Sequence, residues 1–369
     1  MNWSGLNVLI TGGAGHIGSH LAVELIKKGA NIRIADNLWR GKKEYLLDKD
    51  GKPIIDFDKD FLEMDLTEMK NCEKAVDGMD VVFHLADIVA GIDFVFGNEA
   101  YVYRQNVLIN SNMFAASHKE KLEKLSYVGA ACAYPLEKQN DPNHPLFKEE
   151  DMYPAHPESS YGWGKLMGEY ECELYSRSGM LDASILRLHN VYGPNTDLSP
   201  ERSQVIPATI RKAIRYPEED FIIWGNGKQN RAFMYVSDIV DALILSLEKG
   251  VNKGPIQIGN ETKTTIDEIA DKVIEISGKN IRKKYDLTKP VGDLGRAADC
   301  SLAEEVLGWK PKIGLDEGLR MTYEWAEQFL KTQKQSLKFY LSSQALISWL
   351  IYLKYFLYLS NNLYYEYHH

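Results

Sequence analysis

Short apolar runs alternate with segments of helical periodicity over the first 190 residues of the chain. The runs predict buried strands, and apolar residues that recur every three or four positions predict helices. The predicted strands are Asn7–Thr11, Ile32–Ala35, Phe61–Met64, Val81–Leu85, Leu125–Val128 and Ala183–Leu188. This alternation predicts an α/β fold of the Rossmann type, a doubly wound parallel sheet with helices on both faces.

The pattern changes to short helices and strands beyond residue 190, which predicts a smaller C-terminal lobe over residues 191–330. Apolar spacing in Ile239–Leu247 indicates a helix that returns to the first lobe. We therefore assign residues 232–260 to the same domain as residues 1–190. The proline-rich stretch from Ala133 to Pro157 has no periodicity and predicts a loop that borders a site.

An aromatic-rich appendage follows at residues 331–369, with an apolar stretch at Ala345–Leu359. That stretch contains Lys354 and is short for a membrane span, which needs about 20 apolar residues. An interfacial helix, a helix packed on the body or on a partner, and a non-native extension remain alternatives. We favour a packed or poorly ordered appendage over a membrane anchor.

Composition narrows the class of partner. The chain has 369 residues, 44% of them hydrophobic, which is enough for a large core. Its net charge of −9 argues against nucleic acid as a partner. The four cysteines have neither zinc-ligand spacing nor the density of a disulfide scaffold, and the N-terminus has no signal-peptide pattern. The expectation is a cytoplasmic protein without a metal site.

A glycine-rich turn follows the first predicted strand, and a helical pattern begins at Ser19. Gly12 permits a tight turn, Gly15 lets the backbone approach a pyrophosphate, and Gly18 lets the helix pack closely on the strand. The N-terminus of the helix favours the phosphate charge. The turn therefore predicts a dinucleotide site.

Asp36 ends the second predicted strand, eighteen positions after Gly18. A carboxylate there accepts hydrogen bonds from a ribose diol and repels a 2′-phosphate, which predicts NAD as the cofactor. Arg40 and Lys42 lie close enough in the sequence to leave NADP as a minor alternative.

Tyr161 and Lys165 are four residues apart in a helical segment and so share one helix face. An ammonium beside a phenol lowers the pKa of the phenol, which enables the oxygen to take a proton from a substrate alcohol. Taken alone, the pair is more often an ordinary surface pair. The glycine turn makes the catalytic interpretation the better one.

These motifs together resemble the extended short-chain dehydrogenase/reductases that act on nucleotide sugars, from about Leu6 to Phe329. Two segments, Lys124–Pro135 and Asn106–Met113, are most similar to the branch that contains GDP-fucose synthase and GDP-mannose 3,5-epimerase. Further motifs carrying the resemblance are Asp65-Leu66, Phe83-His84-Leu85-Ala86, Arg187–Pro194, Trp224–Gly227, Arg231–Asp238, Arg296 and Leu307–Pro311.

The resemblance implies a set of site residues. The implied NAD contacts are Gly12, Gly15, His16, Ile17, Gly18, Asp36, Asn37, Asp65, Leu66, Leu85, Ala86, Asn106, Tyr161 and Lys165. The implied contacts to the nucleotide sugar are Asn190, Gln204, Val205, Trp224, Arg231 and Arg296. Cys132 occupies the position of a cysteine that exchanges protons beside a sugar ketone in that branch, although a buried, inert thiol is an equal alternative.

Two positions depart from the family pattern. Ala130 stands where the family has the serine or threonine of its Ser-Tyr-Lys triad, which removes a hydroxyl worth roughly 1–3 kcal/mol of transition-state stabilisation. Gln204 lies where these epimerases supply a histidine or lysine as a second acid, and an amide cannot donate and regain a proton at neutral pH.

The sequence therefore predicts an NAD-dependent nucleotide-sugar epimerase, with a GDP-sugar favoured, that oxidises C4 transiently. One alternative is a C4 dehydrogenase that stops at the 4-keto sugar. Another is a weakly catalytic protein that binds NAD or a nucleotide sugar. A 4,6-dehydratase is less favoured because Ala131-Cys132 replaces the usual acidic pair. The family often dimerises through the helix that carries the Tyr/Lys pair, so we expect a homodimer.

Overall fold

The computed structural model describes residues 1–141, 144–292 and 294–335. The apolar stretch at 345–359 lies outside these residues. The chain forms two compact units, Met1–Tyr323 and Glu324–His369. The described part of the second unit, residues 324–335, is helical, and Trp325 stacks on Phe329 within it.

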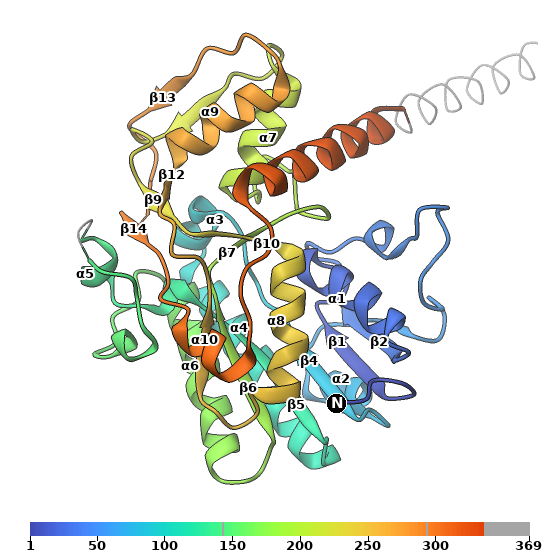
Figure 1. Cartoon of the computed structure of the whole chain (residues 1–369). Helices are drawn as coiled ribbons and strands as arrows, with labels where there is room; N and C mark the ends of the chain where they lie inside the picture. Colours follow the sequence, from blue (N-terminus) through green and yellow to red (C-terminus); the bar gives the residue numbers. More distant parts are fainter. Residues whose placement is uncertain (142–143, 293, 336–369) are drawn as a thin grey trace, which may run out of the picture. The chain divides into compact units, whose positions relative to one another are not determined.

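A seven-stranded sheet organises the first unit, and every neighbouring pair of its strands is parallel (Figure 1). This confirms the predicted doubly wound fold. In spatial order the strands are β11 (Pro255–Ile258), β6 (Ala183–Leu188), β5 (Lys124–Ala130), β4 (Val81–His84), β1 (Asn7–Thr11), β2 (Asn31–Asp36) and β3 (Phe61–Glu63).

Helices pack on both faces of the sheet. Successive residues of a strand point to opposite faces, so an apolar strand presents hydrophobic side chains to both. Val8 and Ile10 belong to one hydrophobic cluster, with α1 and α8, whereas Leu9 belongs to the other, with α2 and α4. The labelled helices of the first unit are α1 (His16–Lys27), α2 (Met69–Val76), α3 (Ile92–Gly97), α4 (Glu99–Glu120), α5 (Leu136–Gln139), α6 (Ser160–Arg177), α7 (Val205–Arg215), α8 (Val236–Lys249), α9 (Ile266–Ser277) and α10 (Ser301–Leu307), and residues 315–323 are helical as well.

Short strands form three small sheets beside the main one. Their residues come from widely separated parts of the sequence, and the sheets join the elements that follow β6. The sheets are β7 (Asn190–Tyr192) with β10 (Phe233–Tyr235); β8 (Ile222–Trp224) with β13 (Lys284–Asp286); and β9 (Asn230–Arg231) with β12 (Thr264–Thr265) and β14 (Gly295–Arg296).

The predicted strands agree with the observed ones to within two residues at each end. The first helix begins at His16, three residues before the predicted start at Ser19, so the end of the glycine turn is already helical. The predicted loop from Ala133 to Pro157 contains α5 and a 3₁₀ turn, Glu149–Met152.

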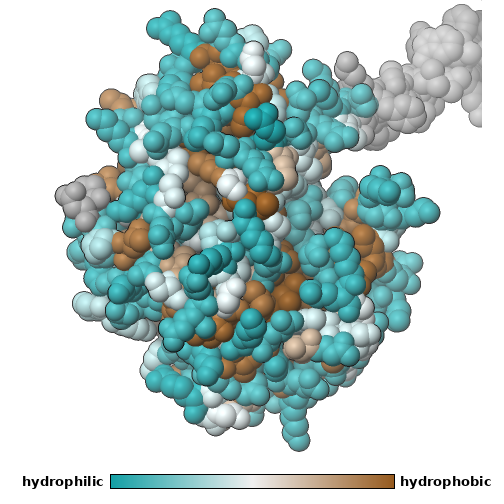
Figure 2. All heavy atoms as spheres, viewed as in Figure 1, coloured by the Kyte–Doolittle hydropathy of each residue, from teal (hydrophilic) through white to brown (hydrophobic). Residues whose placement is uncertain are grey.

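Hydrophilic side chains cover most of the face shown in Figure 2, and hydrophobic ones are exposed there in smaller groups. In the part of the chain that the structure describes, no helix combines the length and the apolar character needed to cross a membrane.

Candidate active site

The carboxyl ends of β1, β2, β4, β5 and β6 open onto a cavity of about 1140 Å³. Ligands of open parallel sheets bind at this edge. Of the predicted site residues, only Asn106 does not line the cavity. Those that do are Gly12, Gly15, His16, Ile17, Gly18, Asp36, Asn37, Asp65, Leu66, Leu85, Ala86, Cys132, Tyr161, Lys165, Asn190, Gln204, Val205, Trp224, Arg231 and Arg296.

Close contacts exclude side chains from the glycine turn, as Gly12 and Gly18 show. Gly12 has φ +66°, and a Cβ atom on it would lie 3.0 Å from the backbone of Ala86. A Cβ atom on Gly18 would lie 2.5 Å from the carbonyl oxygen of Gly12. Helix α1 starts directly after Gly15, and no side chain caps its N-terminus. Its free backbone N–H groups are therefore directed at the cavity, as a pyrophosphate site requires.

Asp36 is buried at the end of β2, and each of its oxygens accepts one backbone hydrogen bond. Ala14 N donates to Oδ2 at 3.0 Å, and Leu38 N donates to Oδ1 at 2.8 Å. Burial raises the pKa of the Asp36 carboxyl group. Each oxygen keeps a further lone pair, so the fixed carboxylate is suited to accept from a ribose diol.

Asn106 and Asp65 hold segments of the chain that border the cavity. Asn106, in α4, accepts from Ile88 N at 2.7 Å and donates to Ile88 O at 3.2 Å. It therefore holds the segment after β4 instead of lining the cavity, and we had expected a direct cofactor contact. The Asp65 carboxylate caps the next turn by accepting from Thr67 N at 2.9 Å.

Lys165 is buried in α6 and has two strong partners. Its Nζ donates to Val128 O at 2.8 Å and lies 2.6 Å from Oδ2 of Asp87. Asp87 lies three residues after the end of β4 and is as deeply buried as the lysine. The lysine charge is therefore neutralised by a carboxylate that the sequence interpretation did not include.

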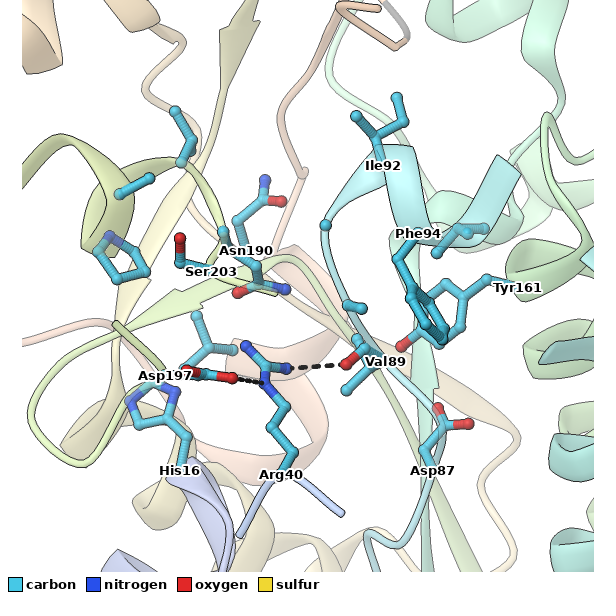
Figure 3. Close-up of a pocket in the computed structure, with 18 of the residues that line it drawn as sticks. His16, Arg40, Asp87, Val89, Ile92, Phe94, Tyr161, Asn190, Asp197 and Ser203 are labelled. Carbon is cyan, nitrogen blue, oxygen red and sulfur yellow. Dashed lines mark hydrogen bonds and ion pairs between the residues drawn. The ribbon is translucent and has the colours of Figure 1, made fainter. Parts of the chain in front are cut away.

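Tyr161 lies one turn before Lys165 at the start of α6, and the lysine Nζ is 5.9 Å from the centroid of its ring. We had expected the lysine to lower the pKa of the phenol. Instead, burial raises the pKa of Tyr161 well above its ordinary value, and the charge of Asp87 raises it further. Figure 3 shows Tyr161 and Asp87 on the same side of the cavity. The pair is in place, but in the ligand-free protein the phenol keeps its proton.

Cys132 lies beside Tyr161 because the turn after β5 packs tightly on α6. A Cβ atom on Gly162 would lie 2.7 Å from the carbonyl oxygen of Cys132, so glycine is needed at this contact. Ala130 and Cys132 both line the cavity. The part of the cavity wall that follows β5 thus contains the Cys132 thiol, and Ala130 provides no hydroxyl at the triad position.

The opposite part of the cavity is formed by the start of α7 and by the small sheets. Gln204 is the N-cap of α7 and makes no side-chain capping bond, and both Gln204 and Val205 line the cavity. Asn190 Nδ2 donates to Ala232 O at 3.1 Å, and the Arg296 guanidinium donates to the side chain of Gln139. Cationic groups and helix N–H donors suit a diphosphate.

An arginine bridge crosses the cavity (Figure 3). Arg40 Nη1 donates to Val89 O at 3.2 Å, and its Nε lies 3.6 Å from Asp197, which also pairs with Arg202 at 3.3 Å. His16 lies next to the bridge, and burial followed by the charges of His20 and Arg40 lowers its pKa, so the ring is neutral at pH 7. The Arg40 side chain is thus engaged away from Asp36, which weakens the case for NADP.

Comparison with known proteins identifies the family. The sequence model of the NAD-dependent epimerase/dehydratase family matches residues 8–259. The chain belongs to this family.

Its relatives in the family catalyse different reactions. GDP-mannose 3,5-epimerase of Arabidopsis thaliana is 32% identical over 329 residues, which cover 89% of this chain and 84% of that protein. UDP-N-acetyl-alpha-D-glucosaminuronate decarboxylase of Bacillus cytotoxicus is also 32% identical, over 86% of this chain and 96% of that protein. The structure of UDP-glucose 4-epimerase of Thermotoga maritima, solved with UDP-glucose, has a TM-score of 0.79 and 29% identity, and covers 88% of this chain and 100% of that one.

The family membership makes this chain an NAD-dependent enzyme of the extended short-chain dehydrogenase/reductase type, in the nucleotide-sugar epimerase/dehydratase group. The site fits the cofactor, because the glycine turn has no room for a Cβ atom at Gly12 or Gly18 and Asp36 presents fixed acceptors. The family alone does not select among epimerisation, dehydration and decarboxylation.

Sequence reasoning missed Asp87, Arg40 as a bridging residue, and Asp197. The signal for Asp87 was present, since a polar residue within a few positions of the carboxyl end of a buried parallel strand lies at the ligand edge of the sheet. No comparable signal links Arg40 to Asp197, because 157 positions separate them and a loop places each one.

Proposed function

We propose that this enzyme is an NAD-dependent nucleotide-sugar epimerase that oxidises C4 of the sugar transiently, with a GDP-sugar as the favoured substrate. The observation that supports this most is the presence of Tyr161 and Cys132 on one wall of the cavity that also contains the glycine turn and Asp36. The same cavity thus contains a phenol that can exchange a proton with the C4 hydroxyl and a thiol that can exchange a proton with a carbon beside the C4 ketone.

The glycine turn and Asp36 would hold NAD, which would supply reversible hydride transfer at C4. Tyr161 takes the proton of the C4 hydroxyl as its O–H bond breaks, and gives a proton back when the alcohol is restored. Lys165 is held in place beside the phenol by Val128 and Asp87. Because the pKa of Tyr161 is raised in the ligand-free protein, little phenolate exists before substrate and cofactor enter the cavity.

Cys132 performs the inversion in this proposal. A ketone at C4 acidifies the hydrogens at C3 and C5, and the Cys132 sulfur removes one of them as a proton, leaving an enolate. Return of a proton to the other face of that carbon inverts it, and the hydride then returns to C4. Gln204 cannot supply that proton, so solvent or another group must do so.

GDP as the carrier rests on the similarity to the plant epimerase, which covers most of both chains. The second candidate is a C4 dehydrogenase that releases or retains the 4-keto sugar, which Gln204 favours because an amide cannot serve as the second acid of an epimerase. A weakly catalytic binding protein is the third candidate.

A labelling experiment separates the three. The protein with NAD would be incubated with GDP-mannose or another GDP-sugar in deuterated water, and the sugar analysed by NMR. Deuterium at C3 or C5 with an inverted centre supports the epimerase. A 4-keto sugar without deuterium supports the dehydrogenase, and an unchanged sugar with measurable binding supports the binding protein.

The matched variant for this experiment is Cys132→Ala. It is expected to abolish incorporation of deuterium and leave oxidation at C4 detectable in a single turnover, whereas Tyr161→Phe is expected to reduce both. Full deuterium incorporation in Cys132→Ala would overturn the role of the thiol.

The same proposal includes a homodimer in a reducing cytoplasm. Helices α4 and α6 expose the aromatic residues Tyr101, Tyr103, Trp163 and Tyr170, which suit a helix-to-helix interface. All four cysteines are free thiols, as expected in a reducing compartment. Light scattering after size exclusion measures the oligomeric state directly, and a monomer at micromolar concentration would contradict the dimer.

A further inference from the structure

Asp87 is a buried carboxylate in direct contact with the Tyr161/Lys165 pair. Its Oδ2 lies 2.6 Å from Lys165 Nζ, and the two side chains are only 6% and 5% exposed. It lies at the carboxyl end of β4 and lines the cavity, so it reaches the pair from the sheet whereas the pair lies on α6. A buried ion pair of this geometry fixes the position of the lysine.

The contact changes what the lysine can do to the phenol. An unopposed ammonium stabilises a nearby phenolate, but a carboxylate at ion-pair distance cancels most of that effect and adds repulsion of its own. The side chains of Asp87 and Tyr161 interact as well, and this interaction favours the protonated phenol. Ala130 supplies no hydroxyl that would oppose this effect.

We propose that Asp87 is the third member of the catalytic pair, a positioning residue that holds Lys165 and sets the pH at which Tyr161 releases its proton. The proposal rests on the proposed role of Tyr161 as the catalytic base. It implies that Tyr161 ionises readily only when the charge of Asp87 is offset by further positive charge in the cavity.

The other titratable groups around the pair come from four further elements. His84, in β4, stays neutral because burial lowers its pKa to about 3, and Tyr127, in β5, stays protonated because burial raises its pKa. Arg40, on the loop after β2, is a cation whose charge couples to Tyr161, and Cys132 raises the pKa of Tyr161 when it ionises. Asp87 is a carboxylate whose pKa is raised by burial, and the charge of Lys165 opposes that rise.

The test measures ionisation of Tyr161 directly in the full-length, cofactor-free protein. Tyrosine labelled with ¹³C at Cζ gives one NMR signal for each phenol, and the Tyr161 signal is identified by its loss in Tyr161→Phe. In the wild type we expect this signal to titrate above the ordinary value of 10.0. In Asp87→Asn, which keeps the shape of the side chain, we expect the midpoint to fall by roughly 1–3 pH units.

Asp93→Asn is the matched control. Asp93 lines the same cavity from α3 and pairs with Lys289 at 3.6 Å, but neither residue contacts the catalytic pair. It should leave the Tyr161 midpoint unchanged. Equal midpoints in wild type and Asp87→Asn would overturn the proposal, and so would an equal shift in both variants. Asp87→Ala provides a second neutral variant if Asp87→Asn does not fold.

Activity gives an independent measurement. If the GDP-sugar assay detects turnover, the acidic limb of the kcat/KM profile should move to lower pH in Asp87→Asn, by about the same shift as the NMR midpoint. If no nucleotide sugar is turned over, the proposed function fails while the NMR titration still decides the role of Asp87. A shifted NMR midpoint with an unmoved kcat/KM profile would show that Tyr161 is not the base, and would overturn the catalytic part of the inference.

Discussion

Gly18→Ala tests whether the geometry of the glycine turn controls cofactor binding. The added Cβ atom would lie 2.5 Å from Gly12 O and 2.7 Å from Gly13 Cα, and both are backbone atoms. Ordinary contact begins at 3.4 Å, so the turn and α1 must separate by about 0.9 Å. Such overpacking costs about 1–3 kcal/mol.

The displacement separates the turn from the N-terminus of α1, which is expected to bind the pyrophosphate. A hydrogen bond to a charged group contributes about 1.5–3 kcal/mol, and about 1.4 kcal/mol is a tenfold change in affinity. Loss of one such bond is therefore expected to weaken NAD binding roughly 10- to 100-fold, as measured by isothermal titration calorimetry.

Two further glycines give a graded series. A Cβ atom on Gly15 would lie 3.1 Å from Gly12 O, so Gly15→Ala should weaken binding less than Gly18→Ala. Gly314 has no atom within 4 Å of a built Cβ, so Gly314→Ala should bind NAD as the wild type does. Wild-type affinity in Gly18→Ala, with an unchanged melting temperature, would refute the reasoning.

Three further predictions concern the triad, the core and pH. Ala130→Ser adds a hydroxyl to the cavity wall and should raise kcat roughly 5- to 150-fold, the equivalent of about 1–3 kcal/mol. An unchanged or lower kcat would argue against a missing triad hydroxyl. Glu169→Leu leaves the buried Arg187 without the carboxylate it contacts at 2.6 and 3.1 Å, and should lower the free energy of unfolding in urea by about 3–5 kcal/mol. Glu24→Gln, in an exposed ion pair, should cost about 0.5 kcal/mol or less, and equal losses would contradict the argument. Because burial raises the pKa of Asp36, NAD affinity should fall on acidification at a higher pH than for an ordinary aspartate, whereas affinity in Asp36→Asn should not depend on this proton.

The main sheet could be predicted from the sequence because most of its strands are buried on both faces and are therefore rich in apolar residues, as in β1. Val8 and Ile10 pack on one layer of helices and Leu9 on the other, so no polar residue interrupts the run. The strands of the small sheets could not be predicted as readily. Several have two or three residues, and their partners lie far away in the sequence, as in the pairing of β12 with β9.

Most of the site could be predicted because its residues belong to local motifs at the ends of strands and helices. The electrostatics could not. Tyr161 and Lys165 were expected to form a pair with a lowered phenol pKa, and that expectation was wrong for the ligand-free protein. Val128 and Asp87, which fix the lysine, are 37 and 78 positions from it, and only the parallel sheet brings them together.

The layer that α8 forms against α1 has a consequence for dissecting the enzyme. Ile239, Leu243 and Leu247 pack in the same hydrophobic cluster as Val8 and Ile10. During synthesis, β1 therefore lacks this part of its packing until residues more than two hundred positions later have been added. A recombinant fragment that stops near residue 190 would contain the glycine turn and Asp36, but the hydrophobic face that α8 covers would be exposed to solvent. Such a fragment should aggregate, and it would be a poor stand-in for the intact enzyme in any cofactor assay.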